Sequence, residues 1–172
     1  MILSDKDIKK ALKTREIKLV PLEQSQICSA SVDLTLSNEW YHFKKEFKSK
    51  KTVDLSKVGF EKTFELRRSP SVTLDPGQMC LGKTVEKITL PGNIMGKLEG
   101  RSRYARMGVI IHTTSALVQP GSDNRQVLEI VNLAPFPIKL SAGMRISQIV
   151  FEYLKSPTSK PYSKFGKIAR KQ

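Results

Sequence analysis

Residues 97–129 have the sequence KLEGRSRYARMGVIIHTTSALVQPGSDNRQVLE. It opens with a basic turn, Gly100-Arg101-Ser102-Arg103, and Arg106 follows shortly after it. Backbone N–H groups in a glycine turn and the forked guanidinium of arginine both suit phosphate oxygens. The turn therefore predicts an anion-binding cradle.

Two short apolar strands are expected nearby, at residues 109–111 and 127–131, with the turn signal Pro120-Gly121 between them. The second strand carries one carboxylate, Glu129, between apolar neighbours. A carboxylate within a strand is costly unless it is paired or performs chemistry. From the pattern alone two interpretations stay open: Glu129 faces solvent, or it is a functional acid–base group.

Several motifs, spread in order along the chain, carry a resemblance to a known family. They are Met1-Ile2-Leu3-Ser4-Asp5, Ala30-Ser31-Val32-Asp33-Leu34, Gly100-Arg101-Ser102, Ala105-Arg106-x-Gly108, His112-Thr113-Thr114, Pro120-Gly121, Leu128-Glu129 and Gly143-Met144-Arg145-Ile146-Ser147-Gln148. In this order the chain resembles the dCTP deaminase family, the deaminating branch of the dUTPase superfamily. The resemblance extends over nearly the whole chain.

Length and composition are typical of one folded domain. The chain has 172 residues, of which 39% are hydrophobic and 27% charged. Apolar runs stay well short of the roughly 18 residues of a membrane helix, and the start of the chain lacks the apolar core of a signal peptide. We therefore expect a cytoplasmic protein without membrane association. Cys28 and Cys80 lie far apart and outside any zinc motif, and are expected to be buried free thiols.

The formal net charge of +14 favours polyanionic partners such as nucleotides, nucleic acid or acidic membrane surfaces. Lysines gather at residues 44–51 and along the tail after residue 154. Such clusters are most often a solvated surface. Zinc-finger, helix-turn-helix and RNP-like patterns are absent from the sequence, so we do not expect specific nucleic-acid binding.

The hydrophobic periodicity predicts a short N-terminal helix followed mainly by strands. Ser4 is positioned to cap the helix, with Asp7 at its third position and Ile8 and Leu12 on one face. Turn dipeptides then separate short apolar runs, which is typical of a β-sandwich or barrel. The expected strands are residues 17–20, 31–36, 71–74, 79–81, 85–90, 94–98, 109–111, 127–131, 138–140 and 146–153, and residues 40–43 are expected to continue the second of them.

The resemblance makes this expectation more specific. It implies a distorted jelly-roll-like β-barrel of the dUTPase type, assembled as a homotrimer with active sites at the subunit interfaces. We interpret residues 1–155 as the single barrel domain. Residues 156–172 form a basic C-terminal tail that is expected to close over the nucleotide as a lid.

Deamination of cytosine requires a water activated to attack C4 and a group that carries protons to the leaving amine. Zinc deaminases share an H-x-E and P-C-x-x-C signature, which this chain lacks, so no zinc is expected. The resemblance implies a metal-independent reaction in which Glu129 is the general base and acid. Ser102 and Arg106 match residues that hold the water and the developing charge. An alternative for Arg106 is a salt bridge to Glu129 that only supports the fold.

The resemblance also implies a set of nucleotide-binding residues. Arg101 and Ser102 match residues at the triphosphate, and Arg103 stands where the family usually has a second Ser. Tyr162 and Gln172 match contacts from the tail. The full expected set is Arg101, Ser102, Arg103, Tyr104, Ala105, Arg106, Ser115, Gln119, Val127, Leu128, Glu129, Gln148, Tyr162 and Gln172. Mg²⁺ is expected on the substrate triphosphate, held by phosphate oxygens and water rather than by protein side chains. His112 is expected to be a structural histidine.

Four departures from the family pattern surround this site. Gln119 replaces an Asp beside the sugar, which in the dUTPase branch activates the hydrolytic water, and Ser115 replaces an Ala. Residues 122–124 replace an aromatic and a Gly, and Lys167-Ile168 replaces a Lys-Tyr dipeptide. We expect conversion of dCTP to dUTP and ammonia, with dTTP as a candidate inhibitor. The alternatives are a dUTP diphosphatase or bifunctional enzyme, and a nucleotide-binding regulatory protein with little catalysis.

Overall fold

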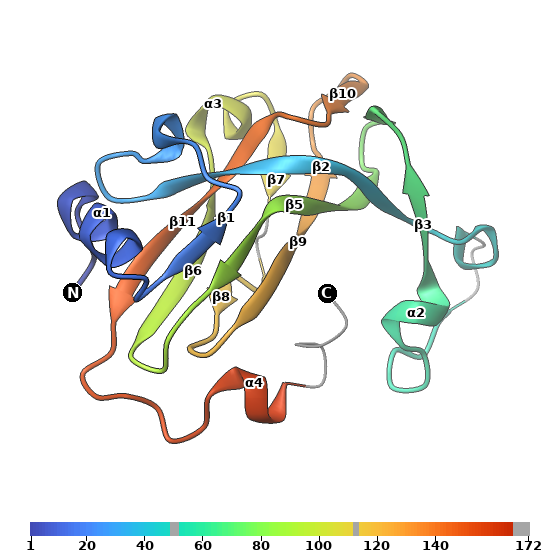
Figure 1. The fold of residues 1–172 in the computed structure, drawn as a ribbon. Helices are drawn as coiled ribbons and strands as arrows, with labels where there is room; N and C mark the ends of the chain where they lie inside the picture. Colours follow the sequence, from blue (N-terminus) through green and yellow to red (C-terminus); the bar gives the residue numbers. More distant parts are fainter. Residues whose placement is uncertain (49–51, 112–113, 167–172) are drawn as a thin grey trace.

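The structure, a computed structural model, describes residues 1–48, 52–111 and 114–166. In this part of the chain one nine-stranded antiparallel sheet curls into a half-barrel around the hydrophobic core (Figure 1). Its order is β7-β9-β5-β2-β11-β6-β8, with β1 paired to β5 and β3 paired to β2, while β4 and β10 form a separate ladder. The strands are β1 (Lys18–Val20), β2 (Val32–Phe43), β3 (Phe64–Arg68), β4 (Ser71–Leu74), β5 (Met79–Thr89), β6 (Ile94–Gly100), β7 (Val109–Ile111), β8 (Leu117–Val118), β9 (Asp123–Asn132), β10 (Ile138–Ser141) and β11 (Arg145–Tyr153).

The short helices lie around the rim of this sheet. They are α1 (Asp5–Lys13), α2 (Phe60–Thr63), α3 (Ser102–Ala105) and α4 (Tyr162–Phe165), with 3-10 turns η1 (Gln24–Gln26) and η2 (Lys45–Lys48). Helix α1 begins as predicted, since Asp7 N donates to Ser4 Oγ at 3.3 Å and Ser4 N donates to Asp7 Oδ2 at 3.2 Å. Its buried residue Ile8 joins the core. The predicted mainly β fold with a short N-terminal helix is confirmed.

The predicted break between strands 79–81 and 85–90 is wrong, because β5 runs without interruption from Met79 to Thr89. Gly82 lies in the middle of this strand. A Cβ there would come within 2.9 Å of Ile130 Cδ1 and of Leu36 Cδ2. The glycine thus marks the close approach of two neighbouring strands rather than a turn.

A projecting arm was not predicted. The second half of β2 pairs with β3 and, together with α2, extends away from the half-barrel (Figure 1). Aromatic rings hold the arm together: Phe60 stacks on Phe64 with centroids 5.2 Å apart, and Tyr41 lies 5.5 Å from Phe60. In the lysine-rich segment 44–51, η2 occupies Lys45–Lys48, and residues 49–51 lie outside the described residues.

The chain after β11 passes under the half-barrel and returns to it at α4 (Figure 1). Tyr162 N donates to Pro120 O at 2.9 Å. Gly121 has φ +81°, and a Cβ there would lie 2.7 Å from Pro161 Cβ. The Pro120-Gly121 turn is therefore the surface on which this part of the tail packs. None of the helices within the described ranges is long and apolar enough to cross a bilayer.

Candidate functional site

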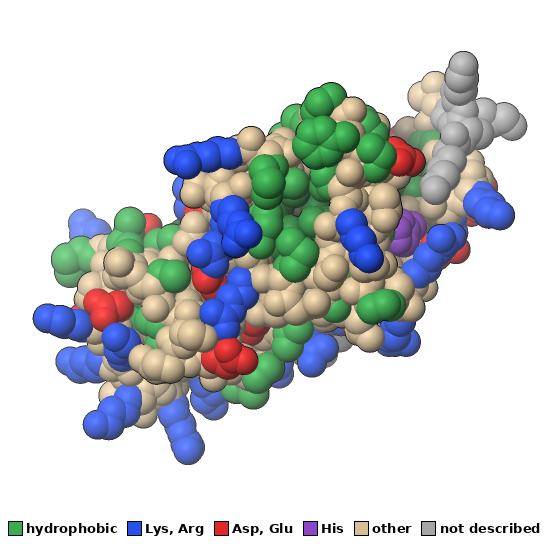
Figure 2. All heavy atoms as spheres, turned by 90° about the horizontal axis from the view of Figure 1, so that it is seen from above, with side chains coloured by type: hydrophobic (Ala, Val, Ile, Leu, Met, Phe, Trp, Pro, Cys, Tyr) green, Lys and Arg blue, Asp and Glu red, His purple; other side chains and the backbone are tan. Residues whose placement is uncertain are grey.

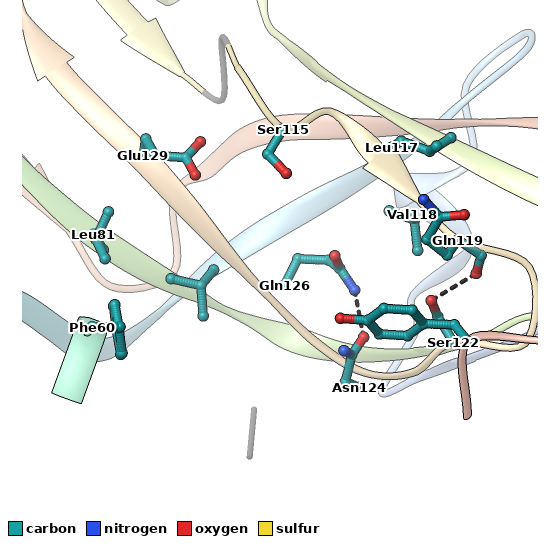
Figure 3. A pocket seen from close by; sticks show the side chains of 12 residues that line it. Phe60, Leu81, Ser115, Leu117, Val118, Gln119, Ser122, Asn124, Gln126 and Glu129 are labelled. Atoms are coloured by element: carbon teal, nitrogen blue, oxygen red, sulfur yellow. Dashed lines mark hydrogen bonds between the residues drawn. The ribbon is translucent and has the colours of Figure 1, made fainter. Parts of the chain in front are cut away.

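A cleft of about 350 Å³ opens between β8, β9 and the returning tail (Figure 3). The arm closes one side of it through α2, and β5 forms part of its floor. The lining residues are Phe60, Leu81, Ser115, Leu117, Val118, Gln119, Ser122, Asn124, Gln126, Val127, Glu129 and Tyr162. Glu129 is the one carboxylate among these described residues.

Glu129 marks one end of the cleft, beside Ser115 (Figure 3). It lies on β9 directly opposite Leu81 of β5, and its side chain is half-buried. Apolar groups from Phe60 and Val127 form the adjoining wall. A half-buried carboxylate next to an apolar wall is placed to exchange protons with a flat, uncharged ring. The side chain of Glu129 therefore lines the cleft, and its role as acid–base group stays a prediction.

The other end of the cleft carries the uncharged polar side chains of Gln119, Ser122, Asn124 and Gln126 (Figure 3), and Tyr162 of α4 is also among the lining residues. Ser122 Oγ donates to Gln119 O at 2.6 Å. Gln126 Nε2 donates to Asn124 Oδ1 at 2.8 Å. This end can make neutral hydrogen bonds to a ligand, but it supplies no charge.

Residues from both faces of β9 line the cleft. Asn124 and Gln126 share one face of the strand, and Val127 and Glu129 the other, yet all four are lining residues. The pairing of β5 with β9 is irregular beside them, since Lys83 lies opposite Val127 and Lys87 opposite Arg125. The extra residues of this irregularity therefore belong to β5.

A second cluster of predicted residues lies around α3 and the neighbouring part of β11. Arg101 is ion-paired with Asp33 of β2, whose side chain is only 5% exposed. Gln148 Nε2 donates to Gly100 O at 3.1 Å, and Ser31 Oγ donates to Gln148 Oε1 at 2.7 Å. These contacts fix Arg101 and Gln148 beside the exposed turn formed by α3.

The α3 turn presents polar and basic groups to solvent. Ser102, Arg103 and Arg106 are exposed, while Tyr104 packs partly against the core with Arg103 5.8 Å from its ring centroid. On the face seen from above, Lys and Arg side chains are spread widely and are mixed with Asp and Glu (Figure 2). The α3 turn is therefore one basic feature on a generally basic surface.

The structure divides the predicted site residues into two groups. Ser115, Gln119, Val127, Glu129 and Tyr162 line the cleft. Residues 101–106 and Gln148 belong to the α3 cluster, and Leu128 is fully buried in the core. Gln172 and His112 lie outside the described residues. Within one chain, Glu129 is thus in the cleft whereas Ser102 and Arg106 are not among its lining residues.

Sequence reasoning missed several cleft residues, most notably Phe60, Asn124 and Gln126. Gln126 lies just before the predicted strand 127–131 and follows the polar residues Asp123, Asn124 and Arg125, so no apolar pattern distinguished it. Phe60 lies more than 50 residues from the other lining residues of β8 and β9, and no local pattern connects it to them.

Comparison with known proteins identifies the family. The family model described as dCTP deaminase-like matches residues 2–154. The chain belongs to the dCTP deaminase-like family. Among its relatives, a "dCTP deaminase, dUMP-forming" of Dictyoglomus turgidum is 40% identical over 95% of this chain and 86% of its own length. A "dCTP deaminase" of Natronomonas pharaonis is 36% identical over 94% of this chain and 85% of its own length.

Solved structures share the fold of this dCTP deaminase-like protein. The 2'-deoxycytidine 5'-triphosphate deaminase of Agrobacterium tumefaciens matches with a TM-score of 0.65 and 19% identity, over 87% of this chain and 46% of that one. A dUTPase of Staphylococcus bacteriophage 80alpha matches with a TM-score of 0.53 and 14% identity, over 87% of this chain and 97% of that one. The dUTPase-type fold expected from the sequence is confirmed.

Proposed function

We propose that this protein is a dCTP deaminase that hydrolyses dCTP to dUTP and ammonia. The observation that carries the proposal is Glu129, the one carboxylate among the described residues of a cleft whose adjoining wall is apolar. Family membership supports the same reaction. A cytosine ring placed against Phe60, Leu81 and Val127 would bring its C4 edge toward the carboxylate.

In this reaction Glu129 takes a proton from the attacking water while the bond from the water oxygen to C4 forms. The bond from C4 to the exocyclic nitrogen then breaks. One water proton leaves on ammonia and the other remains on ring N3, so a uracil carbonyl is produced. Ser102 and Arg106 hold the water and stabilise the negative charge that develops near C4.

A homotrimer completes the site by bringing the α3 cluster of one subunit to the cleft of another. The separation of Glu129 from Ser102 and Arg106 within one chain supports this arrangement. In a cyclic assembly, every cleft would receive the same α3 cluster from a neighbour. Arg101, held by Asp33, and Arg103 would then contact the triphosphate.

The Mg²⁺ ion is expected to be bound by the substrate rather than by the protein. Within the described ranges, no group of three His, Cys, Asp or Glu side chains could hold a metal ion. We place Mg²⁺ on the triphosphate oxygens and water, and assign no step of deamination to it. Tyr162 and the tail act as a lid over the polar end of the cleft. A cytoplasmic location stays a prediction from the sequence.

A second candidate function is supported by relatives named as dUMP-forming, such as that of Dictyoglomus turgidum. An enzyme of that kind must also cleave the triphosphate. The cleft residues argue against cleavage of the triphosphate, because Gln119 has a neutral amide where a second base would be needed to activate the attacking water.

The experiment that tests the proposal is a product assay. Purified protein is incubated with dCTP or dUTP, and ammonia, pyrophosphate, dUTP and dUMP are measured. Ammonia and dUTP from dCTP are expected. Pyrophosphate and dUMP would indicate the bifunctional activity, and the absence of all four products with retained nucleotide binding would indicate a regulatory protein.

A further inference from the structure

Gln126 is a buried polar residue in the middle of the cleft. It is 9% exposed, and its backbone N–H donates to Thr84 Oγ1 at 2.9 Å. Its side-chain Nε2 donates to Asn124 Oδ1 at 2.8 Å, which turns Oε1 toward the cleft (Figure 3). Among the described residues, no hydrogen bond to this Oε1 is present.

An amide oxygen in this position selects the chemistry of its ligand. A carbonyl oxygen only accepts hydrogen bonds, so the ligand must present a donor. A phosphate offers acceptors and would be repelled. Once a ligand covers this oxygen, leaving it without a donor is costly, so a ligand that supplies a donor binds more tightly than one that does not.

The position of Gln126 along β9 identifies which part of a nucleotide it faces. It precedes Glu129 by three residues, which corresponds to about 10 Å along a strand. If C4 of the base lies at Glu129, as the proposed function requires, Gln126 lies beyond the pyrimidine ring and faces the sugar. A deoxynucleoside triphosphate has one sugar donor, the 3'-hydroxyl, because the 5' oxygen is esterified and the 2' position carries only hydrogen.

We propose that Gln126 determines sugar specificity by accepting a hydrogen bond from the 3'-hydroxyl of the bound deoxynucleotide. The inference rests on the proposed function for the direction of the ligand in the cleft. Asn124 is a positioning residue, because its Oδ1 holds the amide of Gln126 with the oxygen turned inward. The neighbouring Gln119 amide can donate to the same hydroxyl, since a hydroxyl both donates and accepts.

The test compares dCTP with 2',3'-dideoxy-CTP, which lacks the 3'-hydroxyl, by titration calorimetry. The titrations are made in the Glu129→Gln background, so that dCTP is not consumed during the measurement. A lack of ammonia release by the unmodified protein would contradict the proposed function, while the ratio of affinities still tests Gln126. With Gln126 present, we expect dCTP to bind about tenfold more tightly than the dideoxy analogue. In Gln126→Met this ratio should fall to about twofold or less.

Three controls make the result specific. Gln126→Glu keeps an acceptor and should keep the preference for dCTP, and it also serves if the Met variant does not fold. Gln24→Met changes an exposed glutamine of η1 outside the cleft and should leave the ratio unchanged. The ratio of the affinities for dCTP and CTP depends on the 2' position, where these two nucleotides differ. This ratio should change by less than about twofold in Gln126→Met.

Three results would overturn the inference. One is equal binding of dCTP and the dideoxy analogue when Gln126 is present. Another is a Gln126→Met variant that weakens the binding of both ligands by the same factor, since Gln126 would then only shape the cleft. A changed preference between dCTP and CTP, with the dideoxy ratio intact, would likewise contradict the assignment to the 3'-hydroxyl.

Discussion

Asp33 and Arg101 form an ion pair between β2 and the start of the α3 turn, and the carboxylate is far more deeply buried than the guanidinium, with side-chain exposures of 5% and 35%. The second oxygen of this carboxylate, Oδ1, is buried and accepts no hydrogen bond from the described residues. Water cannot easily replace the guanidinium at this buried carboxylate, so the ion pair holds Arg101 in place.

We predict that Asp33→Asn lowers both stability and nucleotide affinity. Removing the charge leaves Arg101 without its partner, which should cost about 1–3 kcal/mol because the pair is only partly exposed. Thermal unfolding without nucleotide should show a lower Tm, and calorimetry should show weaker dCTP binding. Glu65→Gln breaks the exposed pair with Arg67 and should change neither. An Asp33→Asn variant with unchanged dCTP affinity would show that the pair does not orient Arg101 for the triphosphate.

The division of the site between subunits makes a prediction about mixed assemblies. Glu129→Gln and Arg106→Ala should each be inactive alone. If each site takes Glu129 from one subunit and Arg106 from another, refolding the two variants together should restore about a quarter of the normal activity by random mixing. Ammonia release before and after mixing measures this. No recovery from mixed assemblies of normal mass would place both residues of a site in the same chain.

Gln119 should prevent diphosphatase activity while leaving deamination intact. A neutral amide has no basic oxygen of useful pKa, so it cannot activate a water for attack on the α-phosphate. We expect dUTP to accumulate from dCTP without being cut to dUMP. Chromatography of the nucleotides over time distinguishes dUTP from dUMP. Pyrophosphate release from dUTP at a rate comparable with ammonia release from dCTP would show that this reasoning is wrong.

The two cysteines should differ in reactivity. Burial raises the pKa of the Cys80 thiol to about 12, whereas Cys28 is partly exposed. At pH 8 a thiol reagent should modify Cys28 rapidly and Cys80 only after unfolding, because the thiolate is the reactive form. Because folding favours the protonated thiol, its contribution to stability is complete below an unfolded pKa near 9.0 and is lost as pH rises toward about 12. Rapid modification of Cys80 in the native protein would contradict this burial.

Local patterns in the sequence predicted the β class, the capped first helix and the acid–base candidate Glu129. These features depend on neighbouring residues, such as the reciprocal pair of Ser4 and Asp7. The continuous strand β5 was missed because Gly82 looks like a turn residue until its packing against Leu36 and Ile130 is known. Phe60 could not be connected to Glu129, because only the path of the projecting arm brings α2 to the cleft.

The separation of Arg106 from Glu129 also lay beyond the sequence. The resemblance implied active sites at the subunit interfaces. The order of motifs along one chain, however, does not tell which residues each subunit contributes to a site. Gln126 was missed for a local reason, because it follows polar residues just outside the predicted strand 127–131, and the direction of its amide oxygen required the structure.

The most direct test of the account is the Glu129→Gln variant, assayed for ammonia release from dCTP and for dCTP binding in the same preparation, with Glu99→Gln as an exposed control. Glutamine keeps the shape of the side chain but cannot accept the proton, and loss of a general base typically costs about 10²–10⁴ in rate. We expect deamination to fall by at least this factor while dCTP affinity stays within about threefold. Near-normal ammonia release by Glu129→Gln would contradict the central claim that this carboxylate performs the chemistry.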